Sequence, residues 1–319
     1  ETKFADYPHT QALFSHFTRV RRSDSLPAFQ SDETPPYAPD DAALHHVFDG
    51  GWLWALRFDN GTTSAGVAVT DALAHDIGLA DGEAAWHRLL THFPSIAEQF
   101  ADAQPIRPFA YSPRLSFRTA RAAGPGWAML PSAAAFVDPL FSTGFPLTLL
   151  GIARLGRILG RYWDTDALDA QLSDYGATTL AEADTVADLI SGCYAGMADF
   201  PAFSSLSMFY FAAASFSEMA RRLDSPRAPQ RFLAADNTQF LNGMRQSTAQ
   251  VRTQGALDAR QTTSRVACLN IAGLCDPAKR RWYGVDLEDV VRGADKLGLC
   301  PDAVRHILRT APWAQMPAD

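Results

Sequence analysis

The stretch 127–144, WAMLPSAAAFVDPLFSTG, constrains the fold of this chain more than any other. Residues 127–130 predict a buried strand, and small residues then lead to a tight turn at Asp138 and Pro139. A long apolar segment follows with Pro146 near its start, which indicates a helix because a proline in the first turn gives up no hydrogen bond. The turn and the helix are joined by Ser142, Thr143 and Gly144. Because the first amides of a helix have no partner within it, this helix start predicts a site for an anion or a polar ligand edge.

The first half of the chain has the alternation and the turn residues of an antiparallel sheet. Segments 45–58 and 62–70 predict a hairpin, and the turn between them contains Asn60 and Gly61, a pair that tolerates positive φ. Segment 109–122 alternates apolar and polar residues and predicts a further strand.

Two other segments of this half interrupt the strands. Segment 82–100 has helical spacing, and we expect Pro94 to divide it into two short helices. Segment 23–41 is rich in proline and acidic residues and predicts a loop, either a surface excursion or a mobile lid.

The second half of the chain is helical in pattern. After the turn, apolar residues recur at helical spacing, while Arg154, Arg157 and Arg161 lie on another face that we expect to be solvated. Further helices are predicted at 166–175, 180–198, 200–223, 237–248, 287–297 and 301–311. Segment 200–217 carries no charge and has the length of a membrane span, but Pro201 and several serines favour a buried helix.

Charge and cysteine spacing exclude several classes of protein. A net charge of −7 and a pI of about 5.6 argue against a surface for nucleic acid or anionic membranes. The cysteines are scattered, and no charged-then-apolar leader opens the sequence, so we expect reduced thiols in a cytoplasmic protein. They are Cys193, Cys268, Cys275 and Cys300. No HxH, HExxH or cysteine cluster predicts a metal site.

Two motifs of this sequence resemble those of one enzyme family. Residues 131–144, PSAAAFVDPLFSTG, resemble the second flavin-contacting motif of FAD-dependent halogenases and related flavin monooxygenases, a run of the type GDAAGFIDPLFSSG. Residues 51–57, GWLWALR, resemble the WxWxIP signature of those halogenases, and 60–66, NGTTSAG, resemble the NGTTSVG hairpin after it. The motifs occur in the family's order and indicate the superfamily without specifying the reaction.

The resemblance implies an α+β fold with FAD as the cofactor. Residues 1–143 would form the substrate-side antiparallel sheet and the flavin-contacting motif, and 144–319 would form a helical region that closes the pocket. No GxGxxG follows a strand in this sequence, although the family carries that fingerprint in its N-terminal part. We therefore expect an N-terminal nucleotide-binding segment, and with it the catalytic lysine of the family, to be missing from this chain.

The resemblance also implies which residues contact the cofactor. The backbone amides of Ser142, Thr143 and Gly144 would lie beside the flavin ring, where they would stabilise negative charge, and Thr143 and Gly144 would also contact a halide. Ser132 stands where the family has an aspartate for the ribityl or ribose hydroxyls. Asp138 and Pro139 either only shape the turn or also contact the ribityl chain.

Four residues are candidates for the substrate pocket: His46, Trp52, Trp54 and Phe141. Trp52 and Trp54 alternate on one strand and so share a face, where they would either meet substrate or simply be buried. The adjacent His45 and His46 face opposite ways, so only one can serve this pocket. Phe141 replaces a glutamate of tryptophan-specific halogenases, which disfavours tryptophan as the substrate, and Leu56 and Arg57 replace Ile-Pro of the signature.

These features predict a FAD-dependent oxidoreductase of halogenase type. It would act with reduced flavin and O2 on an electron-rich phenolic or pyrrole-like small molecule, with flavin reduced by a separate reductase. One alternative is a halogenase-like hydroxylase or reductase that uses no halide. Another is a non-catalytic binding protein that lacks the nucleotide-binding half.

Overall fold

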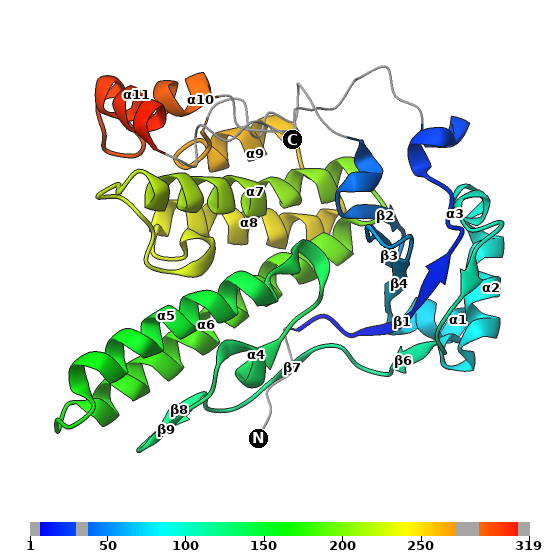
Figure 1. The fold of residues 1–319 in the computed structure, drawn as a ribbon, viewed down its shortest axis with the longest axis horizontal. Coiled ribbons are helices and arrows are strands. Elements are labelled where there is room, and N and C mark those ends of the chain that lie inside the picture. Colours follow the sequence, from blue (N-terminus) through cyan, green and yellow to red (C-terminus); the bar gives the residue numbers. More distant parts are fainter. Residues whose placement is uncertain (1–6, 30–37, 272–286, 312–319) are drawn as a thin grey trace. The chain divides into compact units, whose positions relative to one another are not determined.

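The fold is known from a computed structural model, which describes residues 7–29, 38–271 and 287–311 (Figure 1). The chain divides into two compact units. The sheet unit comprises Tyr7–Phe117 and Phe136–Leu140, and the helical unit comprises the other described residues, 118–135, 141–271 and 287–311. The two units therefore alternate along the chain, whereas the sequence suggested a single division between residues 143 and 144.

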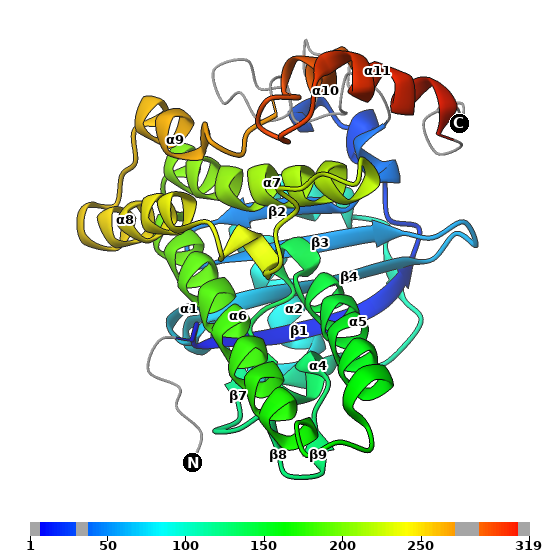
Figure 2. The ribbon, with the colours of Figure 1, turned by 90° about the vertical axis from the view of Figure 1, so that its left-hand side faces the viewer.

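The sheet unit is built on an antiparallel sheet with strand order β2-β3-β4-β1-β5, and β6 also pairs with β1. Figure 2 shows β2, β3, β4 and β1 in this order. The strands are β1 (Thr10–Thr18), β2 (Leu44–Phe48), β3 (Gly51–Arg57), β4 (Thr63–Thr70), β5 (Gln104–Pro105) and β6 (Ala110–Ser112). The turn at Gly61, with φ of 78°, closes the predicted hairpin between β3 and β4. The antiparallel α+β architecture expected from the sequence is confirmed.

The prediction of a single strand over 45–58 is wrong, because this segment contains parts of two strands, β2 and β3. A turn at Asp49 and Gly50 separates β2 from β3, and Gly50 has a φ of 81°. An Asp-Gly pair favours such a turn for the same reason as Asn-Gly, because both residues tolerate positive φ. The predicted strand at 109–122 is also interrupted, since Pro113 lies between β6 and the short β7 (Phe117–Arg118).

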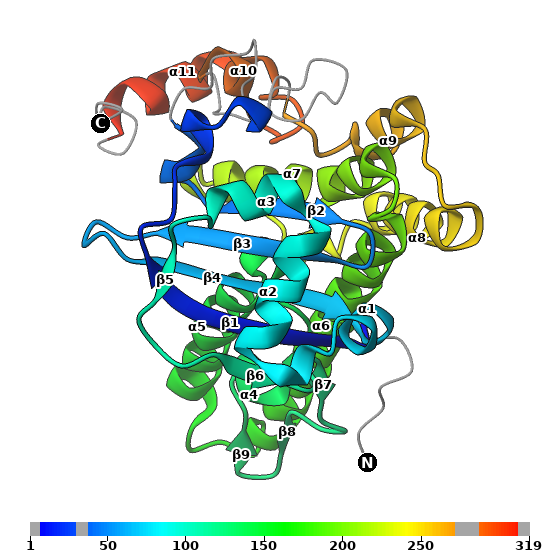
Figure 3. The same ribbon diagram turned by 90° about the vertical axis from the view of Figure 1, so that its right-hand side faces the viewer.

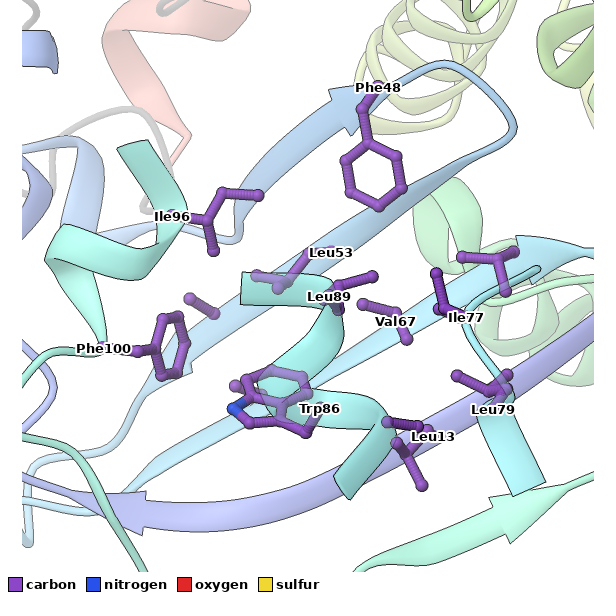
Figure 4. Close-up of a cluster of buried hydrophobic side chains, with 14 of the residues drawn as sticks. Leu13, Phe48, Leu53, Val67, Ile77, Leu79, Trp86, Leu89, Ile96 and Phe100 are labelled. Atoms are coloured by element: carbon purple, nitrogen blue, oxygen red, sulfur yellow. The ribbon is translucent and has the colours of Figure 1, made fainter. Parts of the chain in front are cut away.

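Helices cover one face of this sheet (Figure 3): α1 (Asp71–Asp76), α2 (Glu83–His92) and α3 (Pro94–Gln99). Pro94 separates α2 from α3 as predicted. Alternate strand residues and the inner helix faces form the core of the unit, which includes Phe17 and, as labelled in Figure 4, Leu13, Leu53, Val67, Trp86, Leu89 and Phe100. The Phe17 and Trp86 rings stack with centroids 5.2 Å apart. This core occupies one face of the sheet, so the alternate residues of each strand face the other way.

The described parts of the predicted loop 23–41 form three 3-10 turns, and 30–37 lies outside the described residues. The turns are η1 (Ser23–Ser25), η2 (Pro27–Phe29) and η3 (Pro39–Asp41). Asp40 is 2% exposed and accepts hydrogen bonds from Ser23 Oγ at 2.5 Å and Arg57 Nε at 3.1 Å. Arg57 also donates to the carbonyl of Val20 at 2.7 Å. A buried ion pair therefore fixes this segment to strand β3.

The helical unit contains long helices that pack on one another, and Figure 2 shows α5 and α6 side by side. Its elements are β8 (Ala123–Gly124), β9 (Trp127–Ala128), α4 (Pro131–Ala134), α5 (Gly144–Tyr162), α6 (Leu168–Gly196), α7 (Phe200–Arg222), η6 (Phe232–Ala234), α8 (Thr238–Gln254), α9 (Ala259–Val266), α10 (Leu287–Arg292) and α11 (Pro301–Thr310). Short β10 (Ala135–Phe136) and η5 (Leu140–Ser142) lie where the chain passes between the units. Helix α7 is largely buried, as predicted, and no described helix is long and apolar enough to cross a membrane.

The predictions for residues 127–130 and for the helices between 166 and 198 were wrong. Residues 127–130 are not a buried strand: β9 contains only Trp127 and Ala128, and Trp127 is 42% exposed with its ring packed over Gly124. The predicted separate helices at 166–175 and 180–198 form one continuous helix, α6. Gly176 lies inside α6, and its missing side chain leaves room for the backbone of Ala123, whose nitrogen is only 2.9 Å from the position a Cβ would take.

Candidate functional site

Asp138 forms the centre of a buried polar cluster in the sheet unit. Its side chain is 1% exposed, and Oδ1 accepts hydrogen bonds from Trp52 Nε1 at 3.3 Å and from the Leu140 amide at 3.0 Å. Oδ2 accepts one from Thr10 Oγ1 at 3.2 Å. The bond to an amide two residues ahead is the arrangement by which an aspartate stabilises a turn. Asp138 therefore shapes the turn and also fixes it to strands β1 and β3, while Pro139 beside it is half-buried.

The next residues have an unusual backbone conformation. Phe141 and Ser142 both have positive φ, 61° and 53°. Non-glycine residues seldom adopt this left-handed conformation, and such strain tends to occur at functional sites. Thr143 then adopts helical angles, and α5 begins at Gly144. Two consecutive left-handed residues thus place the backbone that leads into α5.

The start of α5 is uncapped and open on the side of Gly144. The side chain of the N-cap residue Thr143, which is 3% exposed, makes no capping hydrogen bond, and Ser142 before it is exposed. A Cβ added to Gly144 would meet no atom within 4 Å. The amides of this first turn therefore keep their attraction for negative charge, and a ligand can approach the backbone closely at Gly144.

Phe141 belongs to an aromatic cluster of the helical unit. Its ring stacks on Tyr210 at 4.8 Å between centroids and meets Phe211 edge-on at 5.9 Å, with Phe203 at 6.4 Å. Burial raises the pKa of the Tyr210 hydroxyl, which therefore stays protonated over the physiological range. These contacts hold the strained Phe141 against the aromatic side chains of α7.

Trp52 and Trp54 lie on the face of the sheet opposite the core of the unit. Their ring centroids are 5.5 Å apart, which confirms that the two residues share a face. Trp52 is 1% exposed, whereas Trp54 is half-buried with its ring 6.2 Å from that of Phe14. A Cβ on Gly66 would lie only 2.4 Å from the Trp54 ring. Gly66 therefore allows Trp54 to lie flat on the sheet.

The structure places the two histidines on opposite faces, as predicted, but His46 faces away from the tryptophans. His46 is opposite the core residue Leu53, and its Nε2 lies 2.8 Å from Gln99 Oε1. His45 is opposite Trp54, and its ring lies 4.7 Å from that of Trp52. The reason is the register that the Asp49-Gly50 turn imposes, and reading that dipeptide as a turn would have selected His45 from the sequence.

Burial lowers the pKa of both histidines. The pKa of His45 falls to about 4, because of burial and then the neighbouring His46. Burial also lowers the pKa of His46, against the opposing effect of the hydrogen bond with Gln99. His45 is therefore neutral at physiological pH.

Ser132 lies exposed on the short helix α4. The preceding Pro131 is buried against Gly151 of α5, where a Cβ would come within 2.4 Å of the proline ring. The Tyr175 hydroxyl of α6 donates to the carbonyl of Met129 at 2.8 Å. Pro131 and Met129 thus fix the segment that presents Ser132 to the solvent.

The predicted solvated arginine face of α5 is wrong for one of its three members. Arg154 is 16% exposed at its side chain and donates to both carboxylate oxygens of Glu182 of α6, at 2.8 and 3.2 Å. Glu182 is buried at 1% exposure and also accepts the amide of Phe232 at 3.0 Å. Arg157 and Arg161 are exposed as expected.

In the described residues no group of acids, histidines and cysteines could hold a metal ion.

Comparisons with known proteins agree with this fold and these motifs. The fold is shared with the halogenase PltM, solved in complex with phloroglucinol and FAD, at a TM-score of 0.72 and 23% identity over 88% of this chain and 62% of that one. Residues 11–199, more than half of the chain, match the model of the tryptophan halogenase family. The chain belongs to this family.

Curated relatives are halogenases of small molecules. The chain is 28% identical over 198 residues to the monodechloroaminopyrrolnitrin halogenase PrnC of Pseudomonas fluorescens, a match that covers 60% of this chain and 34% of PrnC. It is 29% identical over 147 residues to the tetracycline 7-halogenase of Kitasatospora aureofaciens, covering 44% of this chain and 26% of the relative. The matched region thus spans about a third or less of each relative.

Proposed function

We propose that this chain is the substrate-side and helical part of a FAD-dependent, halogenase-like oxidoreductase. It would act with reduced flavin and O2 on an electron-rich phenolic or pyrrole-like small molecule. The observation that carries the proposal is the strained Phe141-Ser142 backbone, which leads to an uncapped helix start inside the family's flavin-contacting motif. The names of the relatives, halogenases of an aminopyrrolnitrin and of tetracycline, support an aromatic substrate.

The residues at this helix start fit a flavin. Gly144 leaves open space, and the amides of the first turn of α5 attract negative charge without a competing acidic side chain. FAD supplies the redox chemistry when bound, as cofactors of its kind do. The backbone of Ser142, Thr143 and Gly144 would stabilise negative charge at the ring edge, and Thr143 and Gly144 would also receive a halide.

Other residues of the motif would have supporting roles. Asp138 and Pro139 would hold the turn in register, and the exposed Ser132 would be available to the ribityl or ribose hydroxyls. Trp52 and Trp54 in the sheet unit, and Phe141 in the helical unit, would each offer aromatic surface to the substrate, which suits an electron-rich ring.

The partners follow from the same reasoning. A nucleotide-binding segment outside the given sequence would complete the FAD site, and a separate reductase would supply reduced flavin. The cysteines have no paired spacing, which favours a cytoplasmic protein.

Substitution of Gly144 tests this site. In the natural full-length protein, Gly144→Val should abolish flavin-dependent turnover, because its side chain would occupy the space over the helix start. Gly160→Val is a matched control, since Gly160 lies on the same helix and also has no atom within 4 Å of an added Cβ. The readouts are the flavin absorption of the purified protein and the mass of the product formed with and without halide.

Three results are distinguishable. Loss of flavin and turnover in Gly144→Val alone would support the site, and wild-type activity in that variant would contradict it. A product that gains oxygen but never halogen would favour the hydroxylase alternative. A wild-type protein that takes up no FAD would favour the non-catalytic binding protein.

A further inference from the structure

The face of the sheet that carries Trp52 and Trp54 also carries two histidines, His45 of β2 and His16 of β1, and the His16 ring lies 6.5 Å from that of Phe58. Because His45 is directly opposite Trp54 in the register of β2 and β3, the two side chains project from the same face. The imidazole also lies 4.7 Å from the Trp52 ring, tilted by 58°. We call Phe14, His45, Trp52 and Trp54 the aromatic face.

This face remains partly accessible. Phe14 is 38% exposed, and both Trp54 and His45 are half-buried. Gly66 adds no side chain beneath Trp54 and Phe14, so their rings lie close to the sheet. A planar ring that contacts the accessible parts of Phe14 and Trp54 would lie on the face from which His45 projects.

The hydrogen-bonding groups of His45 are uncommitted. Among the residues that the structure describes, no hydrogen bond engages its ring, whereas His46 is held by Gln99 at 2.8 Å. Neutral imidazole has one N–H donor and one nitrogen acceptor. Burial keeps the pKa of His45 near 4, so both functions are present at neutral pH.

We propose that His45 is the polar contact on the aromatic face, accepting a hydrogen bond from the ring O–H or N–H of an electron-rich substrate. The proposal rests on the proposed function, because it assumes that the aromatic face receives the substrate. It makes His45 a determinant of specificity that selects rings with a free hydroxyl or pyrrole N–H over their methylated forms. A site that pairs a substrate donor discriminates against analogues that lack it, since its own polar group is then left unpaired.

The test compares resorcinol with 1,3-dimethoxybenzene, which has the same ring but no O–H. Binding to the natural full-length protein is measured by calorimetry, and turnover is measured separately where a product forms. His45→Phe keeps an aromatic ring against Trp52 but removes the acceptor. We expect it to weaken resorcinol binding and raise its KM about tenfold, the equivalent of one lost hydrogen bond, with little change in kcat. Dimethoxybenzene should bind equally to both proteins.

Two further variants separate this role from a structural one. His45→Asn retains an acceptor and should recover part of the resorcinol preference. His46→Phe removes the neighbouring histidine on the other face and should leave that preference unchanged, although it lowers thermal stability by removing the bond to Gln99.

An unchanged ratio of resorcinol to dimethoxybenzene affinity in His45→Phe would overturn the proposal, and so would failure of the wild-type protein to bind resorcinol or pyrrole. This proposal and the proposed function can fail separately. Calorimetry with resorcinol and 1,3-dimethoxybenzene tests the role of His45 whether or not the protein holds flavin. Flavin content and turnover test the proposed function whether or not binding depends on His45.

Discussion

At the scale of single residues, Arg57 explains a departure from the family signature. The signature has a proline at this position, whereas here Arg57 pairs with the buried Asp40 at 3.1 Å and binds the carbonyl of Val20. A proline could form neither contact. The attachment of the 23–41 segment to β3 therefore accounts for the arginine at this position.

The same pair predicts a pH dependence of stability. Burial alone would raise the pKa of Asp40, but hydrogen bonds from Ser23, the Asp24 amide and Arg57 outweigh it and lower the pKa. A carboxyl with a lowered folded-state pKa stabilises the fold above its unfolded-state value of about 4, and this stabilisation is lost as the pH falls toward the folded-state value. Asp40→Asn should therefore make the free energy of unfolding less dependent on pH below about 4.

Urea unfolding at a series of pH values would measure this slope. Asp24→Asn is a suitable comparison, because Asp24 is an exposed residue of the same segment. The prediction would be contradicted if, below a pH of about 4, the free energy of unfolding of Asp40→Asn fell with decreasing pH as steeply as that of the wild-type protein.

At the scale of elements, a buried ion pair joins α5 to α6. Arg154 and Glu182 make a two-pronged contact, and the Glu182 carboxylate is fully buried. Removing one partner of a buried pair leaves an uncompensated charge, which is costly. The contact therefore makes the packing of these two helices depend on one arginine out of three that look alike in the sequence.

Arg154→Met should lower the free energy of unfolding by about 3 kcal/mol, since Glu182 would lose its charged partner. Arg157→Met and Arg161→Met are matched controls on the same helix, and both should change stability little because these side chains are exposed. Denaturant unfolding of the three variants measures the difference. Equal effects in all three would show that the ion pair does not stabilise the helical unit.

At the scale of the whole molecule, we expect the stability of the folded protein to depend on FAD, the cofactor that the family implies. A cofactor that binds only the folded protein stabilises it by mass action, by about 2.7 kcal/mol at a concentration of one hundred times Kd. Added FAD should therefore raise the melting temperature of the natural full-length protein, and removal of FAD should lower it. A melting temperature that is independent of FAD concentration would contradict FAD binding.

Much of the fold followed from local patterns. Period-two alternation, the Asn60-Gly61 turn and Pro94 predicted the antiparallel sheet and the division of α2 from α3, because each signal acts over a few residues. The stretch 127–130 misled for the opposite reason. Its apolar residues have the composition of a strand. However, the turn at Gly124–Gly126 and the start of α4 at Pro131 limit the strand pairing to Trp127 and Ala128.

The sequence by itself determined the family motifs, the alternation that puts Trp52 and Trp54 on one face, and the helix start at Gly144, since these depend on residue type and spacing. Only the tertiary structure decided that His45 and not His46 joins the tryptophans, that Asp138 binds Trp52 and Thr10, and that Arg154 is buried while Arg157 is not. The physical reason is that each of these depends on which strand or helix lies opposite, and that partner is set by register and packing between segments far apart in the chain.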